Sequence, residues 1–260
     1  MKSLEWYLLL ILAGICLIMG PVSVSAEDEP LVSLLDRISQ RINSYPENKN
    51  YQVEVLTRII EMNKQWEPEK TTIIKAIGKA INGEEDSEIL AATETQDGKT
   101  SDITEKITKQ AEKQKEKARH DAEKKADGKE TKNPLTEFFP FDETKRSEFD
   151  FHRLDDGVID GKDVFIIESA AKTKDAERLE GKYYIDQETL DIVKIDVKPS
   201  KNPMFVNNVG MEIDFKVLPE GYYVMKKMKA KVDAKIVFKS IRQISETEYQ
   251  NYEILHPDTK

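Results

Sequence analysis

The sequence predicts a mainly β protein that contains helices and is built on a strongly curved antiparallel sheet. Three observations support this prediction. Apolar and charged residues alternate over long stretches, turn residues separate these stretches, and about ten of them can be counted. So many strands do not form one flat sheet without curling. A curved sheet also leaves a concave apolar face, which a helix, a lid or a ligand must cover.

The clearest alternation lies between residues 211 and 238. Successive side chains of a strand point to opposite faces, so this stretch predicts one apolar face and one face of lysines. Lysines at every second position would surround a helix on all sides, which argues against a helix. The apolar members form the predicted cavity wall: Met211, Ile213, Phe215, Val217, Met228, Ala230, Val232, Ala234 and Ile236.

The chain has 260 residues and a formal net charge of −9. An acidic balance argues against a nucleic-acid partner, because phosphate binding needs a basic surface. The lysine face is a local exception that we interpret as a solubilising surface. The single cysteine, Cys16, leaves the rest of the chain without a disulfide, a thiol nucleophile or a thiolate metal site.

Residues 1–26 resemble a secretory signal peptide. Lys2 precedes an apolar run from Leu8 to Met19, and small residues end at Ala26, where a peptidase would cut. The run is short for a membrane-spanning helix, although an uncleaved anchor is the alternative. We therefore expect export, and one folded domain over residues 27–260.

A short amphipathic helix is expected first, since Leu31, Leu34, Leu35, Ile38 and Ile42 recur at helical spacing. Three strands should follow as a meander, with turns at Asn82-Gly83 and Asp97-Gly98. Their predicted ranges are 51–66, 71–81 and 87–95.

The composition then changes over an insert at about 103–137. Residues 103–125 are rich in Lys, Glu, Ala and Gln, which predicts a solvated helix supported by propensity and ion pairs. A flexible linker follows, and then the aromatic cluster Phe138, Phe139 and Phe141. The cluster is either an anchor that docks the chain on the core or a lid or plug over a cavity.

Further strands are expected after the insert, ending with a long one up to residue 254. The turn at Asp186–Thr189 predicts a hairpin in the middle of this part. The predicted ranges are 148–154, 164–167, 180–185, 192–199, 211–217, 228–238 and 239–254.

Several turn-and-strand phrases resemble the bacterial outer-membrane lipoprotein-sorting family, the LolA-like carriers. They are Gly181-Lys-Tyr183-Tyr184-Ile185-Asp186, Lys198-Pro-Ser-Lys-Asn-Pro203-Met-Phe-Val206, Asp97-Gly-Lys-Thr-Ser-Asp102 and the closing Tyr249 to Tyr252. The resemblance covers about residues 45–254. It implies an incomplete β-barrel with helices over its concave apolar face, and a cavity that holds lipoprotein acyl chains.

No sequence motif calls for catalysis. The three histidines, His120, His152 and His256, lie far apart, and His152 is interpreted as a packing residue beside Phe151. The sequence lacks metal-ligand spacing, a phosphate loop and a nucleophile motif. We therefore expect no enzyme, no metal and no cofactor.

Two functions remain open at this point. The first is a periplasmic carrier or sorting protein that binds lipid or lipoprotein acyl chains as a monomer. The second is a non-catalytic periplasmic interaction or envelope-stress regulatory scaffold with a filled core, whose partners would be membrane-associated envelope proteins.

Overall fold

The computed structural model describes residues 30–47, 49–124, 139–236 and 239–255. The predicted signal peptide, the predicted linker and Phe138 lie outside these residues. Residues 30–34 form the first turn of a helix, in which the Leu34 N–H donates to the Pro30 carbonyl at 3.2 Å.

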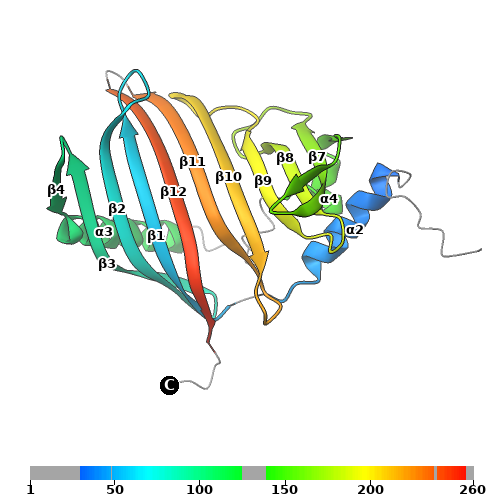
Figure 1. Ribbon diagram of the computed structural model, residues 1–260, viewed down its shortest axis with the longest axis horizontal. Helices are drawn as coiled ribbons and strands as arrows, with labels where there is room; N and C mark the ends of the chain where they lie inside the picture. Colours follow the sequence, from blue (N-terminus) through cyan, green and yellow to red (C-terminus); the bar gives the residue numbers. More distant parts are fainter. Residues whose placement is uncertain (1–29, 48, 125–138, 237–238, 256–260) are drawn as a thin grey trace, which may run out of the picture. The chain divides into compact units, whose positions relative to one another are not determined.

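One curved antiparallel sheet contains every strand of the described chain (Figure 1), which confirms the predicted fold class. The N-terminal meander joins the rest through β1 and the last strand, β12, which pair from Tyr51 opposite Ile254 onward. In spatial order the strands are β4 (Lys99–Asp102), β3 (Glu84–Gln96), β2 (Pro68–Ile81), β1 (Tyr51–Met62), β12 (Lys239–Ile254), β11 (Tyr223–Ile236), β10 (Val206–Val217), β9 (Ile192–Pro199), β8 (Leu179–Asp186), β7 (Lys162–Ala171) and β5 (Phe149–Arg153), with β6 (Gly157–Ile159) also on β7.

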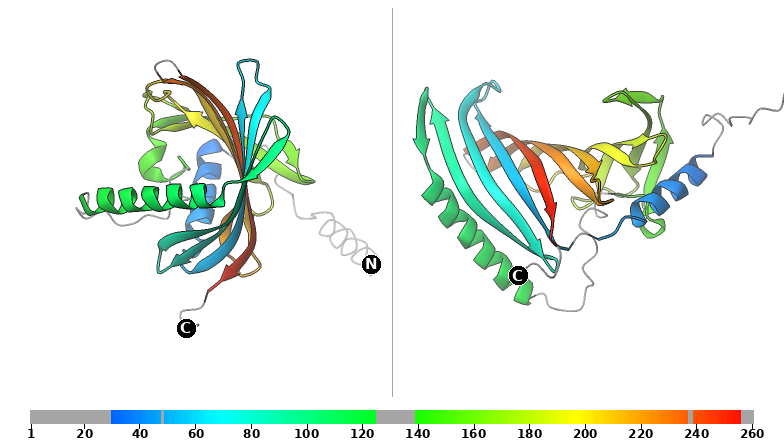
Figure 2. Two further views of the ribbon diagram at one scale, coloured as in Figure 1. Left: turned by 90° about the vertical axis from the view of Figure 1, so that its left-hand side faces the viewer. Right: turned by 60° about the horizontal axis from the view of Figure 1, so that its bottom comes forward.

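Three helices complete the described chain: α2 (Leu31–Asn43), α3 (Thr104–Lys124) and the short α4 (Glu143–Arg146). The two predicted helices are thus confirmed, whereas α4 was not expected. The left view of Figure 2 shows α2 and α3 on the same side of the sheet. We call the face of the sheet on this side the helix face. None of the described helices is long and apolar enough to cross a membrane.

Several predicted strand ends were wrong. The first strand stops at Met62 instead of residue 66, because Asn63 forms a turn in which its side-chain oxygen accepts the N–H groups of Gln65 and Glu67, both at 2.9 Å. Trp66 lies in this turn with a positive φ of 63°. β7, β10 and β11 are longer than predicted, and β4 and β6 were missed.

The phrase that begins at Gly181, one of those that resemble the LolA-like carriers, has a structural reason for its glycine. Its φ is +148°, and a Cβ there would lie 2.2 Å from the Asp196 carbonyl oxygen and 2.9 Å from the Val197 Cα. Both obstacles are backbone atoms of the paired strand β9, so they cannot rotate away. The close pairing of β8 and β9 therefore requires glycine at this position.

The lysine face is mixed in charge, because it carries acidic residues as well as lysines. Neighbouring strands place acidic residues beside the lysines, so charges of opposite sign cross the sheet. Lys194 binds Glu212 at 2.9 Å, and Lys229 lies 3.5 Å from Glu246. The hydrogen bond from Lys194 lowers the pKa of Glu212. Such cross-strand pairs help to fix the strand register.

Candidate functional site

Strand register brings the predicted cavity residues onto the helix face. Met211 lies opposite Ala230, and Ile213 lies opposite Met228. A bulge then lets Phe215 face Met225 and keeps the apolar side chains on one side. The register therefore places these residues on one face, and those whose side chains the structure describes differ in how far they are buried.

Part of the helix face is a closed aromatic core. Phe139 packs between strands β10 and β11, with ring centroids 5.6 Å from Phe215 and 6.3 Å from Tyr223. Phe141 meets Tyr183 edge to face at 4.9 Å. All five side chains are buried. Two of the three predicted lid or plug residues are therefore packed into this core, which agrees with the anchor interpretation.

Helix α2 is fastened to the same core near its C-terminal end. Arg41 Nε donates to Asp191 Oδ1 at 2.7 Å, and the Tyr45 hydroxyl donates to the same oxygen at 2.5 Å. The Tyr45 ring stacks on Tyr223 at 5.1 Å. Burial, with Asp191 beside the hydroxyl, raises the pKa of Tyr45, so this group remains a donor at neutral pH. Leu35 and Ile38 of α2 are buried.

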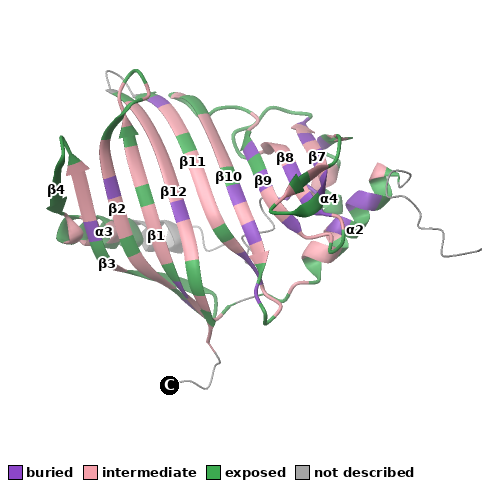
Figure 3. Ribbon diagram, in the orientation of Figure 1, coloured by how far each residue is buried: buried purple, intermediate pink, exposed green. Residues whose placement is uncertain are grey.

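The helix face is more open from β10 across β11 and β12 to β1. Met211, Met228, Ala230 and Val232 are only half-buried. Figure 3 shows the same contrast, because buried positions gather on β7 to β10 and on α2, whereas β1, β11 and β12 are mostly intermediate or exposed. We call the half-buried surface from β10 to β1 the open trough.

Hydroxyl groups lie beside the apolar side chains of the open trough, and sequence reasoning missed them. Thr247 pairs with Met228 across β11 and β12, and Ser245 pairs with Ala230. Thr57 of β1 shares a 3.1 Å hydrogen bond with Thr247. The position of these hydroxyl groups beside the trough follows from the pairing of β12 with β11. It cannot be read from the β12 sequence alone.

Helix α3 is attached to β3, which lies two strands beyond the β1 side of the trough. The Thr104 hydroxyl accepts the Ala92 N–H at 2.9 Å, and the Ile103 N–H donates to the Ala92 carbonyl at 2.9 Å. Ala92 is buried and lies opposite Ile74 on the helix face. The start of α3 is therefore held against β3, whereas the charged residues further along the helix are exposed up to Glu116.

The remaining predicted wall residues lie nearer the ends of their strands. Val217 is 39% exposed beside the turn after β10. Ala234 is buried and lies opposite Ile241. The side chain of Ile236 is outside the described residues.

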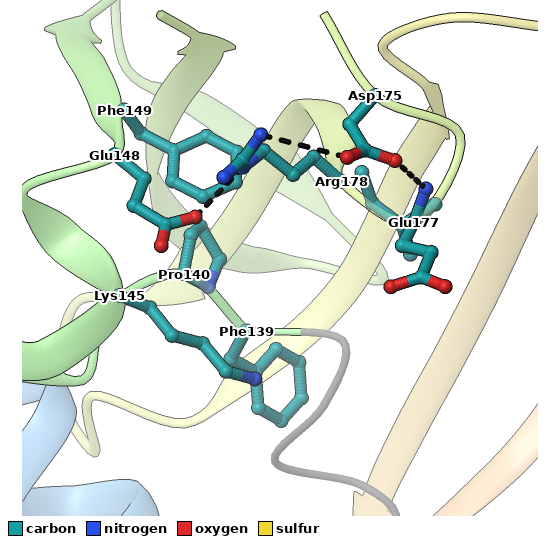
Figure 4. Close-up of a pocket in the computed structure, with 9 residues that line it drawn as sticks. Phe139, Pro140, Lys145, Glu148, Phe149, Asp175, Glu177 and Arg178 are labelled. Carbon is teal, nitrogen blue, oxygen red and sulfur yellow. Dashed lines mark hydrogen bonds and ion pairs between the residues drawn. The ribbon is translucent and has the colours of Figure 1, made fainter. Parts of the chain in front are cut away.

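A separate pocket of about 330 Å³ lies beside Phe139, and its lining does not include the predicted wall residues (Figure 4). Its apolar lining comes from Phe139, Pro140, Phe149 and Leu179. At its rim, Arg178 Nε donates to Glu148 at 2.7 Å, and its other nitrogen lies 3.8 Å from Asp175. The Arg178 guanidinium is thus already balanced by two carboxylates.

The interpretation of His152 as a packing residue was wrong. It lies on the exposed face of β5, opposite Glu168, while its neighbour Phe151 points to the aromatic core. The side chains of His120 and His256 are outside the described residues. Within the described part of the chain, no group of three or more His, Cys, Asp or Glu residues is arranged to hold a metal ion.

No family model matches the sequence, and a search of curated proteins found no match. Among solved structures, the chain is similar to an outer membrane lipoprotein-sorting protein domain from Vibrio parahaemolyticus (10% identity, 87% of this chain and 92% of that chain, TM-score 0.39). It is also similar to a LolA superfamily protein from Nitrosomonas europaea (9%, 86% and 93%, TM-score 0.36) and to the MucA–MucB complex structure from Pseudomonas aeruginosa (8%, 84% and 93%, TM-score 0.26). Identities and TM-scores this low say nothing about what this chain binds.

Proposed function

We propose that this protein is a non-catalytic lipid carrier that holds an acyl chain in the open trough. One observation carries the proposal: Ile213 and Phe215 are buried, with the Phe139 ring packed on Phe215, yet Met211 and Met228 on the same face are left half-buried. A soluble monomer rarely leaves an apolar surface of this kind open unless it is a binding site.

The residues of the trough suit a flexible apolar ligand. Met211 and Met228 have unbranched side chains that adapt to different shapes. Ala230 is small and leaves space between them. Removing an acyl chain from water contributes about 0.8 kcal/mol per CH₂ group, so a modest length of buried chain gives useful affinity.

The hydroxyl groups give the trough a polar side. Thr57, Ser245 and Thr247 can bind the ester or amide group where an acyl chain joins its head group. This combination favours an acylated ligand, such as a lipid or a lipoprotein, over a plain hydrocarbon. With the secretory leader expected from the sequence, such a carrier would work in the periplasm.

The alternative is an interaction or envelope-stress regulatory scaffold. It is favoured by the closed aromatic core around Phe141 and Tyr183, which leaves no room for a ligand in that part. Its partner surface would be α3, where exposed charges such as the Lys109–Glu105 pair face solvent. Deletion of residues 105–132 separates the two functions: loss of partner binding with unchanged lipid uptake supports the scaffold.

A charged substitution in the trough tests the carrier function. Val232→Asp places a carboxylate among the apolar side chains of the trough and should abolish binding of a fluorescent fatty acid. Ile244→Asp is the matched control, because Ile244 is also half-buried and lies on the opposite face of the adjacent strand β12. If both variants fold and bind the probe as the unmodified chain does, the trough is not the binding surface.

A further inference from the structure

The connection between β9 and β10 exposes two large apolar side chains side by side. Met204 is 80% exposed and Phe205 is 59% exposed. They lie outside the open trough, at the end of the sheet where β10 begins, near the top of Figure 1. An adjacent exposed Met and Phe are costly in a soluble protein, which indicates a contact surface.

The backbone holds this connection in a defined and strained conformation. Phe205 has a φ of +68°, which bulky residues rarely adopt. Its carbonyl accepts the Lys235 N–H at 2.8 Å, and the Val206 N–H closes a turn onto the Pro203 carbonyl at 3.0 Å. The Asn202 side chain donates to the Asn207 carbonyl at 2.7 Å. The turn therefore keeps the Phe205 side chain directed to solvent, and strain of this kind gathers at functional positions.

The surroundings of Met204 and Phe205 are basic. Residues 197–211 contain no Asp or Glu, although the whole chain has 49 acidic residues. Lys198, Lys201 and Lys235 are exposed. Two carboxylates attached to this region are engaged with cations: Asp233 lies 3.4 Å from Arg242 Nε, and Asp175, whose backbone carbonyl accepts the Lys201 N–H, lies 3.8 Å from Arg178.

We propose that this connection, residues 200–205, together with Lys198 at the end of β9 and Lys235 of β11, docks the protein on an anionic lipid bilayer. Phe205 and Met204 would enter the boundary between head groups and acyl chains, while the three lysines contact the anionic head groups. The surface stands apart from the open trough, so docking does not depend on the proposed lipid cargo. It adds the means by which a carrier of lipids would reach the membrane.

Vesicle sedimentation of the protein as purified from its host tests the proposal, and the unmodified protein and every variant are prepared in the same way. The probe is vesicles of equal parts phosphatidylglycerol and phosphatidylcholine, compared with pure phosphatidylcholine. Phe205→Asn should weaken binding about tenfold, because it removes the aromatic ring. Since Asn tolerates positive φ, the same change should leave the fold at least as stable. Lys201→Gln should weaken binding about fivefold, and added salt should reduce binding further.

Val158→Ser is the matched control, because Val158 is 67% exposed on β6. It should bind the anionic vesicles as the unmodified chain does. Equal binding by Phe205→Asn and the unmodified chain would overturn the proposal, as would equal binding to both kinds of vesicle. Self-association of the unmodified chain that is lost in Phe205→Asn, without vesicle binding, would overturn it in favour of a second copy of the chain.

Discussion

The contact of Tyr45 with Asp191 offers a sharp test of how α2 is held on the sheet. Tyr45→Phe removes only the hydroxyl that donates to Asp191 Oδ1 at 2.5 Å and leaves the ring stacked on Tyr223. The Asp191 side chain is 12% exposed, so water replaces the lost donor poorly, while Arg41 still pairs with it. The expected loss in the free energy of unfolding is about 1.5 kcal/mol, the value of a hydrogen bond to a charged group.

Tyr45→Ala also removes the ring. The lost burial of a half-buried ring and the lost stacking add about 2 kcal/mol, so the total should be about 3–4 kcal/mol. Urea unfolding followed by circular dichroism measures both variants against the unmodified chain. If Tyr45→Phe changes nothing, the hydroxyl network does not hold α2 in place. If the two substitutions destabilise equally, the stacked ring contributes nothing to the attachment.

Three further predictions concern the sheet and its core. Gly181→Ala should be destabilised by well over 2 kcal/mol, because the new Cβ would meet the backbone of β9, whereas Gly210→Ala, which meets nothing within 4 Å, should stay near the unmodified chain in the same urea experiment. Burial raises the pKa of Asp186, but hydrogen bonds from Lys162 and two backbone N–H groups lower it more. The pKa of Asp186 in the folded state is therefore below its unfolded value. Its contribution to the free energy of unfolding is present above about pH 4 and is lost as the pH falls through the folded-state pKa. Thermal unfolding of Asp186→Asn should therefore depend less on pH in that acid range. Phe141→Ala, at a buried edge-to-face contact, should lose about 3–5 kcal/mol, and a melting temperature close to that of the unmodified chain would contradict the closed core.

Local pattern was enough to predict the antiparallel strands and one face of the site. Alternation identified Met211, Ile213, Met228 and Ala230 as one face, because side-chain direction in a strand depends only on parity. The same reasoning could not tell a closed core from an open trough. That difference is set by Phe139, which reaches β10 from a distant segment of the chain.

The other features of the site depend on pairing between strands that are distant in the sequence, so the local pattern could not predict them. The hydroxyl groups of Ser245 and Thr247 line the trough because β12 pairs with β11, and the acidic neighbours of Lys229 come from β10 and β12. The predicted end of the first strand was wrong because of a turn. Trp66 continues the apolar pattern of the strand, but it lies in a turn formed by the Asn63 side chain. Tyr45 gave no signal of its own, because its partner Asp191 is distant in sequence.

Native mass spectrometry of the protein purified from its host is the most direct test of the carrier function. We expect a lipid or acylated peptide to copurify at close to one molecule per chain and to be lost in Val232→Asp but kept in Ile244→Asp. A mass without ligand that stays unchanged when lipids are added would contradict the proposal. The apolar side chains of the trough would then be part of the core, and the scaffold function, with α3 as its partner surface, would take the carrier's place.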